Sequence, residues 1–288
     1  ILRTDLDQGN SELLIGWRIE NAETRADKKS KWWNFRGLVP DKKGSILITS
    51  YYNHSSVHVY NIYTGEKKDL FDGEKLKVDY WMVDDFSVVR LARKEKGRDR
   101  SYFWVDYDDA NSLKPVVLPN GKEYQVEIGK YYNRRYFIEE FVPNSRNIVF
   151  SENEKGDLFR LIEVDPLNGK IVRELAAHNK VSLGYYEGYF RTYISEKERA
   201  FAGYRYYDDH YVNIWLTEEY SNIQKAVDEE FPNIENRIIK KCNNDLSWCL
   251  IGVFDATGVD QIYLYEKSKG VVSFTLFFSQ TGERGQYA

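Results

Sequence analysis

Four histidines are the whole imidazole supply of this chain, and imidazole is the side chain that most often performs acid–base chemistry near neutral pH. His54 and His58 are four residues apart, which on a strand separates them by roughly 13 Å, too far to share a metal ion. We interpret His58 as a cross-strand packing residue. His178 falls in a loop without a partner motif, and His210 follows two aspartates in a predicted hairpin.

Nucleophilic catalysis needs a serine or cysteine, a base and an orienting acid brought together. The sequence contains no Gly-x-Ser-x-Gly motif and no other local signature for these roles. The acidic run 106–111 suggests a calcium loop, but its alternating pattern breaks at Ala110 and neither the glycine nor the distal glutamate follows. We therefore predict no catalytic residue, no metal site and no cofactor in this chain.

Two cysteines, Cys242 and Cys249, flank a short polar segment that predicts a hairpin turn between strands. Neighbouring antiparallel strands can bring two Cα atoms within the roughly 4.4–6.8 Å that a disulfide requires. A bonded pair would indicate an exported, for example periplasmic, protein, whereas a free pair would be two small buried hydrophobic side chains. The sequence leaves both states open, with the free pair slightly preferred, and leaves the compartment open between cytoplasmic and exported.

Composition limits the classes of partner. Aromatic residues make up 16% of the chain, the net charge is −4 and the pI is about 5.8. This balance predicts no nucleic-acid partner, and the absence of an apolar run of roughly 20 residues predicts no membrane span. Tyrosines are crowded near residues 185–207, where Tyr185, Tyr186 and Tyr189 are candidates for a contact surface.

The elements around these residues follow a repeat. Segment Ser56–Asp69 is an alternating strand, a Thr-Gly turn and a returning strand, and similar segments recur at Phe159–Glu174 and Ile262–Thr275. Glycine supplies the positive φ that a tight hairpin needs. The copies lie about a hundred residues apart, which accommodates two units of roughly 45–50 residues, the repeat length of a four-stranded propeller blade. We therefore predict an all-β fold, a β-propeller of four-stranded antiparallel blades.

Five blades can be assigned from the strand pattern. Their first strands are expected at residues 33–39, 78–83, 136–142, 181–194 and 237–242. Segment Glu218–Glu230 departs from the pattern, because Ile223, Ala226 and Val227 have helical spacing and a Phe-Pro pair follows. We predict one short helix inserted before the last blade.

The predicted domain boundaries follow from the same pattern. Residues 1–32 are a partial N-terminal blade or closing strand, residues 33–280 are the propeller, and residues 281–288 are a tail or the start of a linker. Because the chain begins at Ile1 without a methionine or a signal-type apolar segment, we expect a processed or truncated end. Five blades and a fragment could close as six, but we favour a piece of a longer chain.

The order of these pieces resembles the propeller domain of the prolyl oligopeptidase family of serine peptidases, in particular its bacterial dipeptidyl aminopeptidase and acylaminoacyl-peptidase-like branch. The resemblance spans roughly residues 33–280. It is carried by the following segments: Leu38-Val39-Pro40-Asp41, Val57–Gly65, Arg100–Trp104, Asn222–Pro232, Asn236–Ile239 and Tyr263–Glu266. The helix followed by proline is the most specific of them.

The resemblance implies a non-catalytic propeller that gates peptide access to an α/β-hydrolase domain of the same polypeptide, and that hydrolase domain is not present in this chain. Glu139 and Glu140 are similar to the paired glutamates that anchor substrate amines in one dipeptidyl-peptidase branch, but we favour the interpretation that they are edge charges of a blade strand. Neighbours in a strand point to opposite faces, so at most one of them could reach a central funnel. The alternative is a free-standing propeller that binds a protein or peptide partner. A self-contained propeller hydrolase is disfavoured by the lack of clustered ligands.

Overall fold

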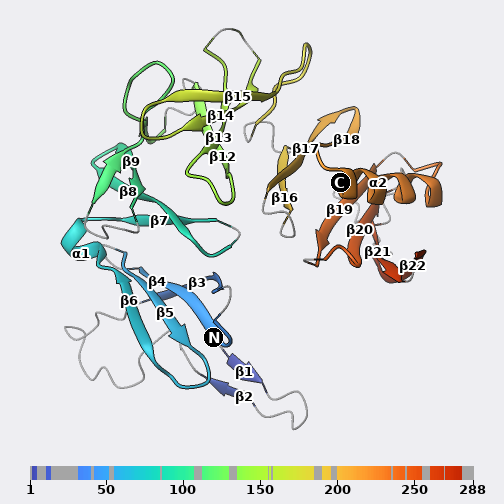
Figure 1. The fold of residues 1–288 in the computed structure, drawn as a ribbon, viewed down its shortest axis with the longest axis horizontal. Coiled ribbons are helices and arrows are strands. Elements are labelled where there is room, and N and C mark those ends of the chain that lie inside the picture. The colour runs from blue at the N-terminus through green and yellow to red at the C-terminus, as the bar shows by residue number, and fades with distance from the viewer. Residues whose placement is uncertain are drawn as a thin grey trace, which may run out of the picture. The chain divides into compact units, whose positions relative to one another are not determined.

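The structure is a computed structural model, and β-strands dominate it. It describes residues 2–4, 11–13, 32–39, 42–51, 55–84, 86–106, 112–129, 135–154, 156, 158–184, 190–195, 200–234, 236–243, 245–254, 260–268 and 270–280. Strands that follow one another in the chain pair antiparallel within each sheet (Figure 1). The fold class is all-β and the sheets are blades of a β-propeller, which confirms the predicted class.

The sheets have the following strands. The first contains β3 (Trp32–Leu38), β4 (Ser45–Tyr51), β5 (Val57–Asn61) and β6 (Lys67–Phe71). The second contains β7 (Tyr80–Val83), β8 (Val89–Lys96), β9 (Asp99–Val105), β10 (Leu113–Pro115) and β11 (Gln125–Glu127). The third contains β12 (Tyr136–Phe141), β13 (Ile148–Glu152), β14 (Arg160–Asp165) and β15 (Lys170–Ala176). The fourth contains β16 (Arg191–Ser195), β17 (Ala200–Asp208) and β18 (His210–Trp215). The fifth contains β19 (Asn236–Cys242), β20 (Trp248–Phe254), β21 (Asp260–Ser268) and β22 (Val271–Gln280).

The remaining elements are a short strand pair, β1 (Leu2–Thr4) with β2 (Ser11–Leu13), and two helices, α1 (Gly73–Leu76) and α2 (Glu218–Glu230). Helix α2 has the predicted bounds, which confirms the insertion before the last sheet. The second sheet differs from the predicted four strands, because β10 and β11 both pair with β9, at different residues along it. The fourth differs because its first strand begins at Arg191 rather than at residue 181.

The chain divides into two compact units. One unit comprises Ile1–Arg134, Arg146–Ile148 and Val164–Arg173, and the other comprises Arg135–Ser145, Val149–Glu163 and Glu174–Ala288. The predicted division into residues 1–32, 33–280 and 281–288 stays a prediction. Residues 281–288 lie outside the described residues, and only residues 2–4, 11–13 and 32 of the N-terminal segment are described.

Trp81 is the centre of the core in the first unit. Its side chain is fully buried with Val57, Val78 and Val89, and its ring lies 5.1 Å from that of Phe71. The indole Nε1 donates to the carbonyl oxygen of residue 55 at 2.5 Å, so the polar group of the ring is satisfied. Loss of such a ring costs about 3–5 kcal/mol.

Helix α1 was not predicted, because its four residues are too few to show a period. It forms because Asp72 caps it: one carboxylate oxygen of Asp72 accepts the backbone N–H groups of Glu74 and Lys75, both at 3.0 Å. Lys77 ends the helix in the left-handed conformation, with φ of 53°. The turn therefore depends on local side-chain hydrogen bonds rather than on an apolar face.

Among the described residues, two apolar clusters lie in the second unit. One joins the third and fourth sheets through Val149, Leu161, Phe201 and Tyr204. The other joins α2 to the fifth sheet through Tyr220, Ile223 and Val227 on the buried face of the helix and Ile239, Ile251 and Tyr265 on the strands. The helical spacing of the three α2 residues explains why this segment folds as an amphipathic helix.

Several buried tyrosines make the stability of the second unit depend on pH in the alkaline range. Burial raises the pKa of Tyr193, Tyr204, Tyr206 and Tyr265 above the ordinary value. A raised folded-state pKa means that the folded protein holds the phenolic proton more firmly than the unfolded chain does. The resulting stability is fully present below the unfolded pKa of about 10 and is lost as the pH rises through the folded pKa.

We predict that replacing Tyr265 by phenylalanine moves the midpoint of alkaline unfolding to higher pH, because the variant has no proton to lose there. Circular dichroism followed against pH measures the midpoint, and phenolate absorbance reports the ionisation. The matched control is Tyr63→Phe, which removes an exposed tyrosine. Equal midpoints for Y265F and Y63F would show that burial of Tyr265 does not contribute to alkaline unfolding.

Candidate functional site

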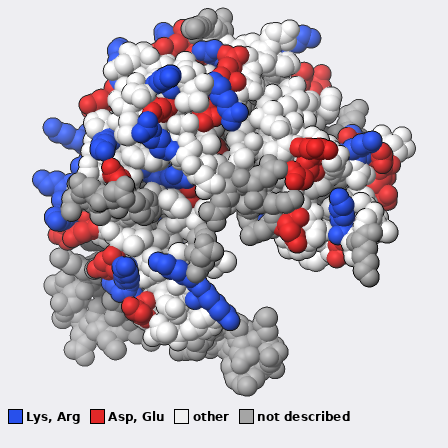
Figure 2. Space-filling model, in the orientation of Figure 1, with Lys and Arg blue, Asp and Glu red and all other residues white. Residues whose placement is uncertain are grey.

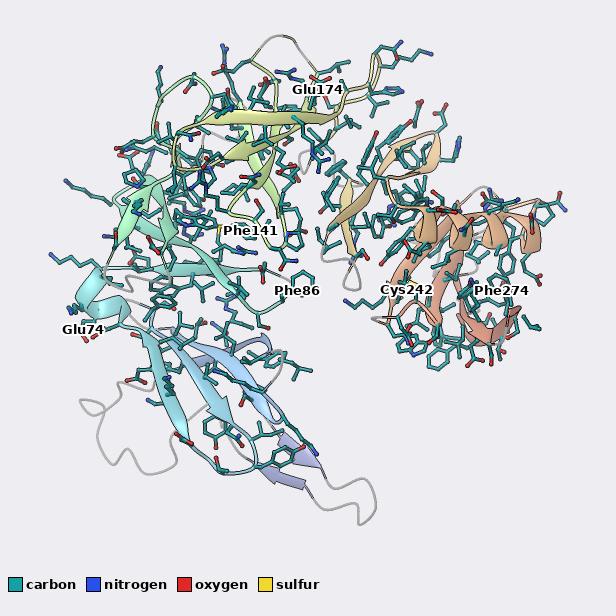
Figure 3. All side chains as sticks on the ribbon, viewed as in Figure 1. Glu74, Phe86, Phe141, Glu174, Cys242 and Phe274 are labelled. Carbon is teal, nitrogen blue, oxygen red and sulfur yellow. A yellow bond between two sulfur atoms is a disulfide. The ribbon has the colours of Figure 1, made fainter. Side chains whose placement is uncertain are left out.

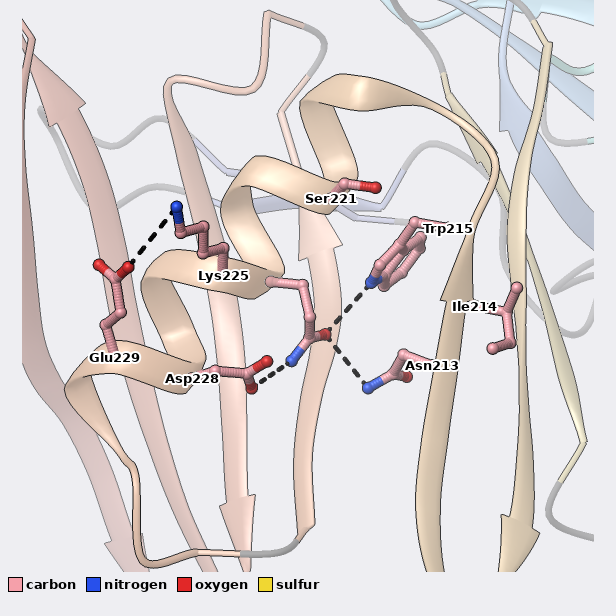
Figure 4. A pocket seen from close by; sticks show the side chains of 8 residues that line it. Asn213, Ile214, Trp215, Ser221, Lys225, Asp228 and Glu229 are labelled. Atoms are coloured by element: carbon pink, nitrogen blue, oxygen red, sulfur yellow. Dashed lines mark hydrogen bonds and ion pairs between the residues drawn. The ribbon is translucent and has the colours of Figure 1, made fainter.

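The candidate site is an open hollow of about 530 Å³ between helix α2 and strand β18, which we call the α2–β18 hollow (Figure 4). Its lining comes from the strand and from one side of the helix. The lining residues are Asn213, Ile214, Trp215, Ser221, Gln224, Lys225, Asp228 and Glu229. All of them belong to the second unit, so one compact part of the chain forms the whole hollow.

Gln224 connects the helix to the strand at the base of the hollow. Its Oε1 accepts from the Trp215 Nε1 and from the Asn213 Nδ2, both at 3.2 Å, and its Nε2 donates to Asp228 Oδ1 at 2.9 Å (Figure 4). The Asn213 Nδ2 also donates to the carbonyl oxygen of Arg237 at 3.0 Å. The side-chain amide of Gln224 is therefore held in one orientation by its partners.

The end of α2 next to the hollow is acidic. Asp228, Glu229 and Glu230 occupy the last turn, where the helix dipole disfavours negative charge, and that turn has no basic residue of its own. Arg237 on β19 offsets this: its Nη1 donates to the Phe231 carbonyl oxygen at 2.7 Å and its Nε lies 2.8 Å from Asp228 Oδ1. A cation from the next sheet thus takes the place of a helix C-terminal lysine or arginine.

The rim of the hollow carries groups that remain accessible. Lys225 Nζ lies 4.0 Å from Glu229 Oε1, and both side chains are largely exposed, so the pair contributes little stability. Ser221 is exposed beside them, and the Trp215 ring supplies an apolar wall. The residues lining the hollow include no histidine and no cysteine. The rim thus offers a hydroxyl, an indole ring and side chains of both charges to a ligand.

The structure does not bring the histidines together among the residues that it describes. His58 is buried, and its Nδ1 lies 2.6 Å from Oδ1 of Asp69, its cross-strand partner on β6. His178 accepts two backbone N–H groups of its own loop, and His210 is exposed at the start of β18. His54 lies outside the described residues. In the described part of the chain, no group of three His, Cys, Asp or Glu side chains is placed to hold a metal ion.

Glu139 and Glu140 have different partners. The Ser151 hydroxyl on β13 donates to Glu139 Oε1 at 2.5 Å, and the Thr192 hydroxyl on β16 donates to Glu140 Oε2 at 3.2 Å. One carboxylate therefore bonds within its own sheet and the other bonds to the next sheet, as expected for neighbours that point to opposite faces. Their role as an anchor for a peptide amine stays a prediction.

Cys242 and Cys249 form a disulfide that joins β19 to β20. Both residues are buried in the core cluster of the last sheet, where Figure 3 shows Cys242 and Phe274. The sequence analysis slightly preferred two free cysteines, and the disulfide in the structure corrects that preference. Sequence separation alone did not decide between the two states, because the choice depends on the register that makes the cysteines direct cross-strand partners.

The hairpin between the cysteines is built by side-chain caps. Asn243 Oδ1 accepts the Trp248 N–H at 3.0 Å, and Asp245 Oδ1 accepts the Ser247 N–H at 3.0 Å. Hydrogen bonds from the hydroxyl and N–H of Ser247 lower the pKa of the Asp245 carboxyl. These bonds fix the turn that brings the two cysteines into register.

The tyrosine-rich region is only partly visible. Tyr185, Tyr186 and Tyr189 lie outside the described residues, so their assignment as a contact surface stays a prediction. Tyr204 and Tyr206 of the same region are buried and lie with ring centres 6.3 Å apart, so they belong to the core. The region therefore contains packing residues as well as any contact residues.

The visible surface has mixed charge. On the face that Figure 2 shows, Lys and Arg side chains are interspersed with Asp and Glu, and the coloured residues form no broad area of one sign. Of the helices that the structure describes, neither is long and apolar enough to cross a membrane.

The α2–β18 hollow was missed by the sequence analysis. The predicted helix included Gln224, Lys225, Asp228 and Glu229, and their spacing of four residues places them on one polar side of the helix. Nothing in the sequence indicated that Trp215 on β18 faces that side. The sequence therefore indicated the helix side of the hollow, whereas the strand side became apparent only in the tertiary structure.

No protein-family model matches the chain, and no curated protein matches it significantly. Among solved structures, the chain is similar to an uncharacterized protein from Listeria monocytogenes EGD-e, with 13% identity and a TM-score of 0.38 over 85% of this chain and 65% of that one. It is similar to a putative 6-phosphogluconolactonase from Bacteroides uniformis, with 13% identity and a TM-score of 0.31 over 88% and 80%.

A third similar structure is a post-proline cleaving enzyme from Rickettsia typhi, with 10% identity and a TM-score of 0.31. The match covers 94% of this chain and 48% of that enzyme. The chain thus spans less than two thirds of the Listeria protein and about half of the Rickettsia enzyme. At these values the similarities do not assign the chain to a family.

We predict that the double variant Cys242→Ala with Cys249→Ala unfolds at lower denaturant concentration than the parent chain. Closing a loop of this length, with seven residues of sequence separation, contributes about 2–3 kcal/mol in the chain-entropy description. Urea unfolding followed by fluorescence measures the difference, with the reduced parent chain as control. Detection of two free thiols in the unreduced, unfolded parent would contradict the disulfide.

Proposed function

We propose that this chain is the non-catalytic β-propeller domain of a prolyl-oligopeptidase-like serine hydrolase, and that it gates peptide access to an α/β-hydrolase domain of the same polypeptide. The observation that carries the proposal is the exposed apolar face of the last strand, β22. We call it the β22 surface and define it by its exposed large apolar side chains, Val271, Val272, Leu276, Phe277 and Phe278.

The β22 surface is unusual in its composition. The ten residues of β22 include no charged side chain, and Phe277 is 69% exposed. Among the described residues β22 pairs with β21 on one side only, so its other edge offers unpaired backbone groups as well as apolar side chains. Long, uncharged and apolar edges promote pairing with another polypeptide segment.

Other edge strands of this chain are protected by charge. Strand β6 includes Lys67, Lys68 and Asp69, and strand β15 includes Lys170, Arg173 and Glu174. The same chain therefore uses charged residues where an edge faces water and omits them from β22. This difference supports a role in which β22 is covered by another domain.

The buried disulfide supports a further part of the proposal. Disulfides persist in oxidising compartments, and the two cysteines of this chain are joined in a disulfide. We propose that the protein is exported, which is compatible with a hydrolase that acts on peptides outside the cytoplasm.

The proposal is tested on the native gene product. We expect an intact mass of roughly 65–75 kDa, as for a propeller with a hydrolase domain of common size, and a Gly-x-Ser-x-Gly motif beyond residue 288. Hydrogen exchange should then show slower exchange of the β22 amides in the native product than in the 288-residue chain. A native product of 34.0 kDa would overturn the proposal.

A variant separates docking from general stability. Phe277→Glu should reduce the peptidase activity of the native product several-fold, because a buried charge disfavours domain contact. Val172→Glu is the matched control, since Val172 is an exposed valine on the charged edge strand β15. Equal activity of F277E and V172E would show that the β22 surface is not a domain contact.

A second candidate function is a free-standing propeller that binds a peptide, and the α2–β18 hollow favours it. Under this alternative the exposed rim residues Lys225 and Glu229 contact the ligand. The double variant Lys225→Ala with Glu229→Ala should then weaken peptide binding by the 288-residue chain without changing its unfolding midpoint. Unchanged binding would exclude the rim of the hollow as the contact.

A further inference from the structure

Arg36 lies at a β-bulge in strand β3. In the pairing of β3 with β4, Phe35 lies opposite Ile48 and Gly37 lies opposite Leu47, which leaves Arg36 without a partner residue. A bulge turns the side chain of the extra residue out of the normal alternation of a strand. Such re-aimed side chains are common beside functional sites.

The bulge is held by close contact with the next sheet. Gly37 has φ of 154°, and a Cβ at this position would lie 2.2 Å from the hydroxyl oxygen of Ser87, in the turn between β7 and β8. A larger residue does not fit unless the Ser87 side chain moves, and the φ of Gly37 is one that other residues rarely adopt. The bulge and this close packing therefore place the backbone of Arg36 beside the turn between β7 and β8.

Three contacts orient the guanidinium group of Arg36. Its Nε donates to the Thr49 hydroxyl at 3.0 Å, and its Nη1 donates to the Tyr80 hydroxyl at 3.1 Å. The carbon at its centre lies 4.7 Å from the centre of the Tyr80 ring. Thr49 is fully buried, so one end of the guanidinium is anchored in the core. The Nη2 group has no protein partner among the described residues.

Arg36 is partly buried, yet it has no carboxylate partner in the described chain. Three other partly buried arginines have a carboxylate oxygen at 2.7–2.8 Å: Arg90 with Asp84, Arg160 with Glu152, and Arg237 with Asp228. Removing a charge from water is costly unless an opposite charge compensates it. Within the described ranges, no carboxylate pairs with Arg36 to provide that compensation.

A second arginine increases the positive charge at the same tyrosine. The central guanidinium carbon of Arg93, on β8, lies 4.6 Å from the centre of the Tyr80 ring. The Nε of Arg93 is buried without a hydrogen-bond partner in the described structure. Its Nη2 lies 2.9 Å from Glu95 Oε1, an oxygen that also accepts from the Arg100 Nε at 2.8 Å. One glutamate is thus shared by two arginines. The nearby Asp79 uses Oδ2 to accept the Glu95 N–H at 2.6 Å.

Apolar side chains flank Arg36 on the same edge strand. Phe35 is 54% exposed and Leu38 is 71% exposed, and both belong to β3. An oriented guanidinium binds carboxylates well because its N–H groups match the two oxygens. The flanking side chains add a surface for an apolar group next to the carboxylate.

We propose that Arg36, together with Tyr80 and Arg93, binds the carboxylate of a peptide whose residue next to that group is apolar. The carboxylate is either the C-terminus of the peptide or an acidic side chain. The ligand contributes the missing negative charge, and Phe35 and Leu38 contact its apolar part. This site belongs to one compact unit of the chain and requires no associated hydrolase, so its test is independent of the proposed function.

The test is isothermal titration calorimetry of the 288-residue chain with three N-acetylated hexapeptides. The first ends in leucine with a free carboxylate, the second is its C-terminal amide, and the third is an amide with an internal glutamate beside leucine. Binding of the first alone identifies the C-terminus as the ligand. Binding of the third in addition identifies an acidic side chain as a second source. Binding of the amide as tightly as the free acid, or no binding of any peptide, would overturn the proposal.

Variants connect the binding to Arg36. Arg36→Gln should weaken binding of the carboxylate peptide about tenfold or more, because a charged hydrogen-bond donor is lost. Arg98→Gln is the matched control, since Arg98 is an exposed arginine between β8 and β9 of the second sheet and has no ion pair among the described residues. Should R36Q not fold, Arg36→Lys keeps the charge but not the planar donor group and should weaken binding several-fold. Equal affinity of R36K and R98Q would then reject the site.

Discussion

The edge strands of the antiparallel sheets impose the main physical constraint on this chain, because their outward backbone groups need protection from other strands. Among the described residues, each sheet ends in two strands whose outward backbone groups have no ladder partner, and such groups attract other strands. The chain protects the edges β6 and β15 with charged side chains, and helix α2 lies beside the edge strand β18. In the part of the chain that the structure describes, strand β22 has neither form of protection. The two features on which the proposals rest, the bulge at Arg36 and the β22 surface, both lie on edge strands.

Polar side chains, rather than apolar packing alone, determine where α2 lies beside the fourth and fifth sheets. Gln224 satisfies the Trp215 indole and the Asn213 amide at once, and Arg237 compensates the acidic end of the helix. Each of these groups would be costly to bury without its partner. The helix is consequently tied to both neighbouring sheets, and the hollow beside it has a defined shape.

The sequence predicted the elements well where a period was long enough to recognise. Alternating apolar residues marked most strands, and the helical spacing of Ile223 and Val227 marked α2 with its observed bounds. Helix α1 was missed because it depends on the Asp72 cap over four residues. Strand β11 was missed because three residues show no alternation, and its pairing with β9 is a tertiary event.

The candidate sites were less predictable than the fold, because their residues are distant in the sequence. The sequence by itself determined the all-β class, the inserted helix and the uncharged character of β22, since these follow from local pattern and composition. Only the tertiary structure decided that Cys242 and Cys249 are bonded partners, that Trp215 faces Gln224, and that Arg36 donates to Tyr80. These contacts depend on strand register and on a one-residue bulge. A shift of the register by one residue, or loss of the bulge, would turn the side chains to the opposite face of the sheet.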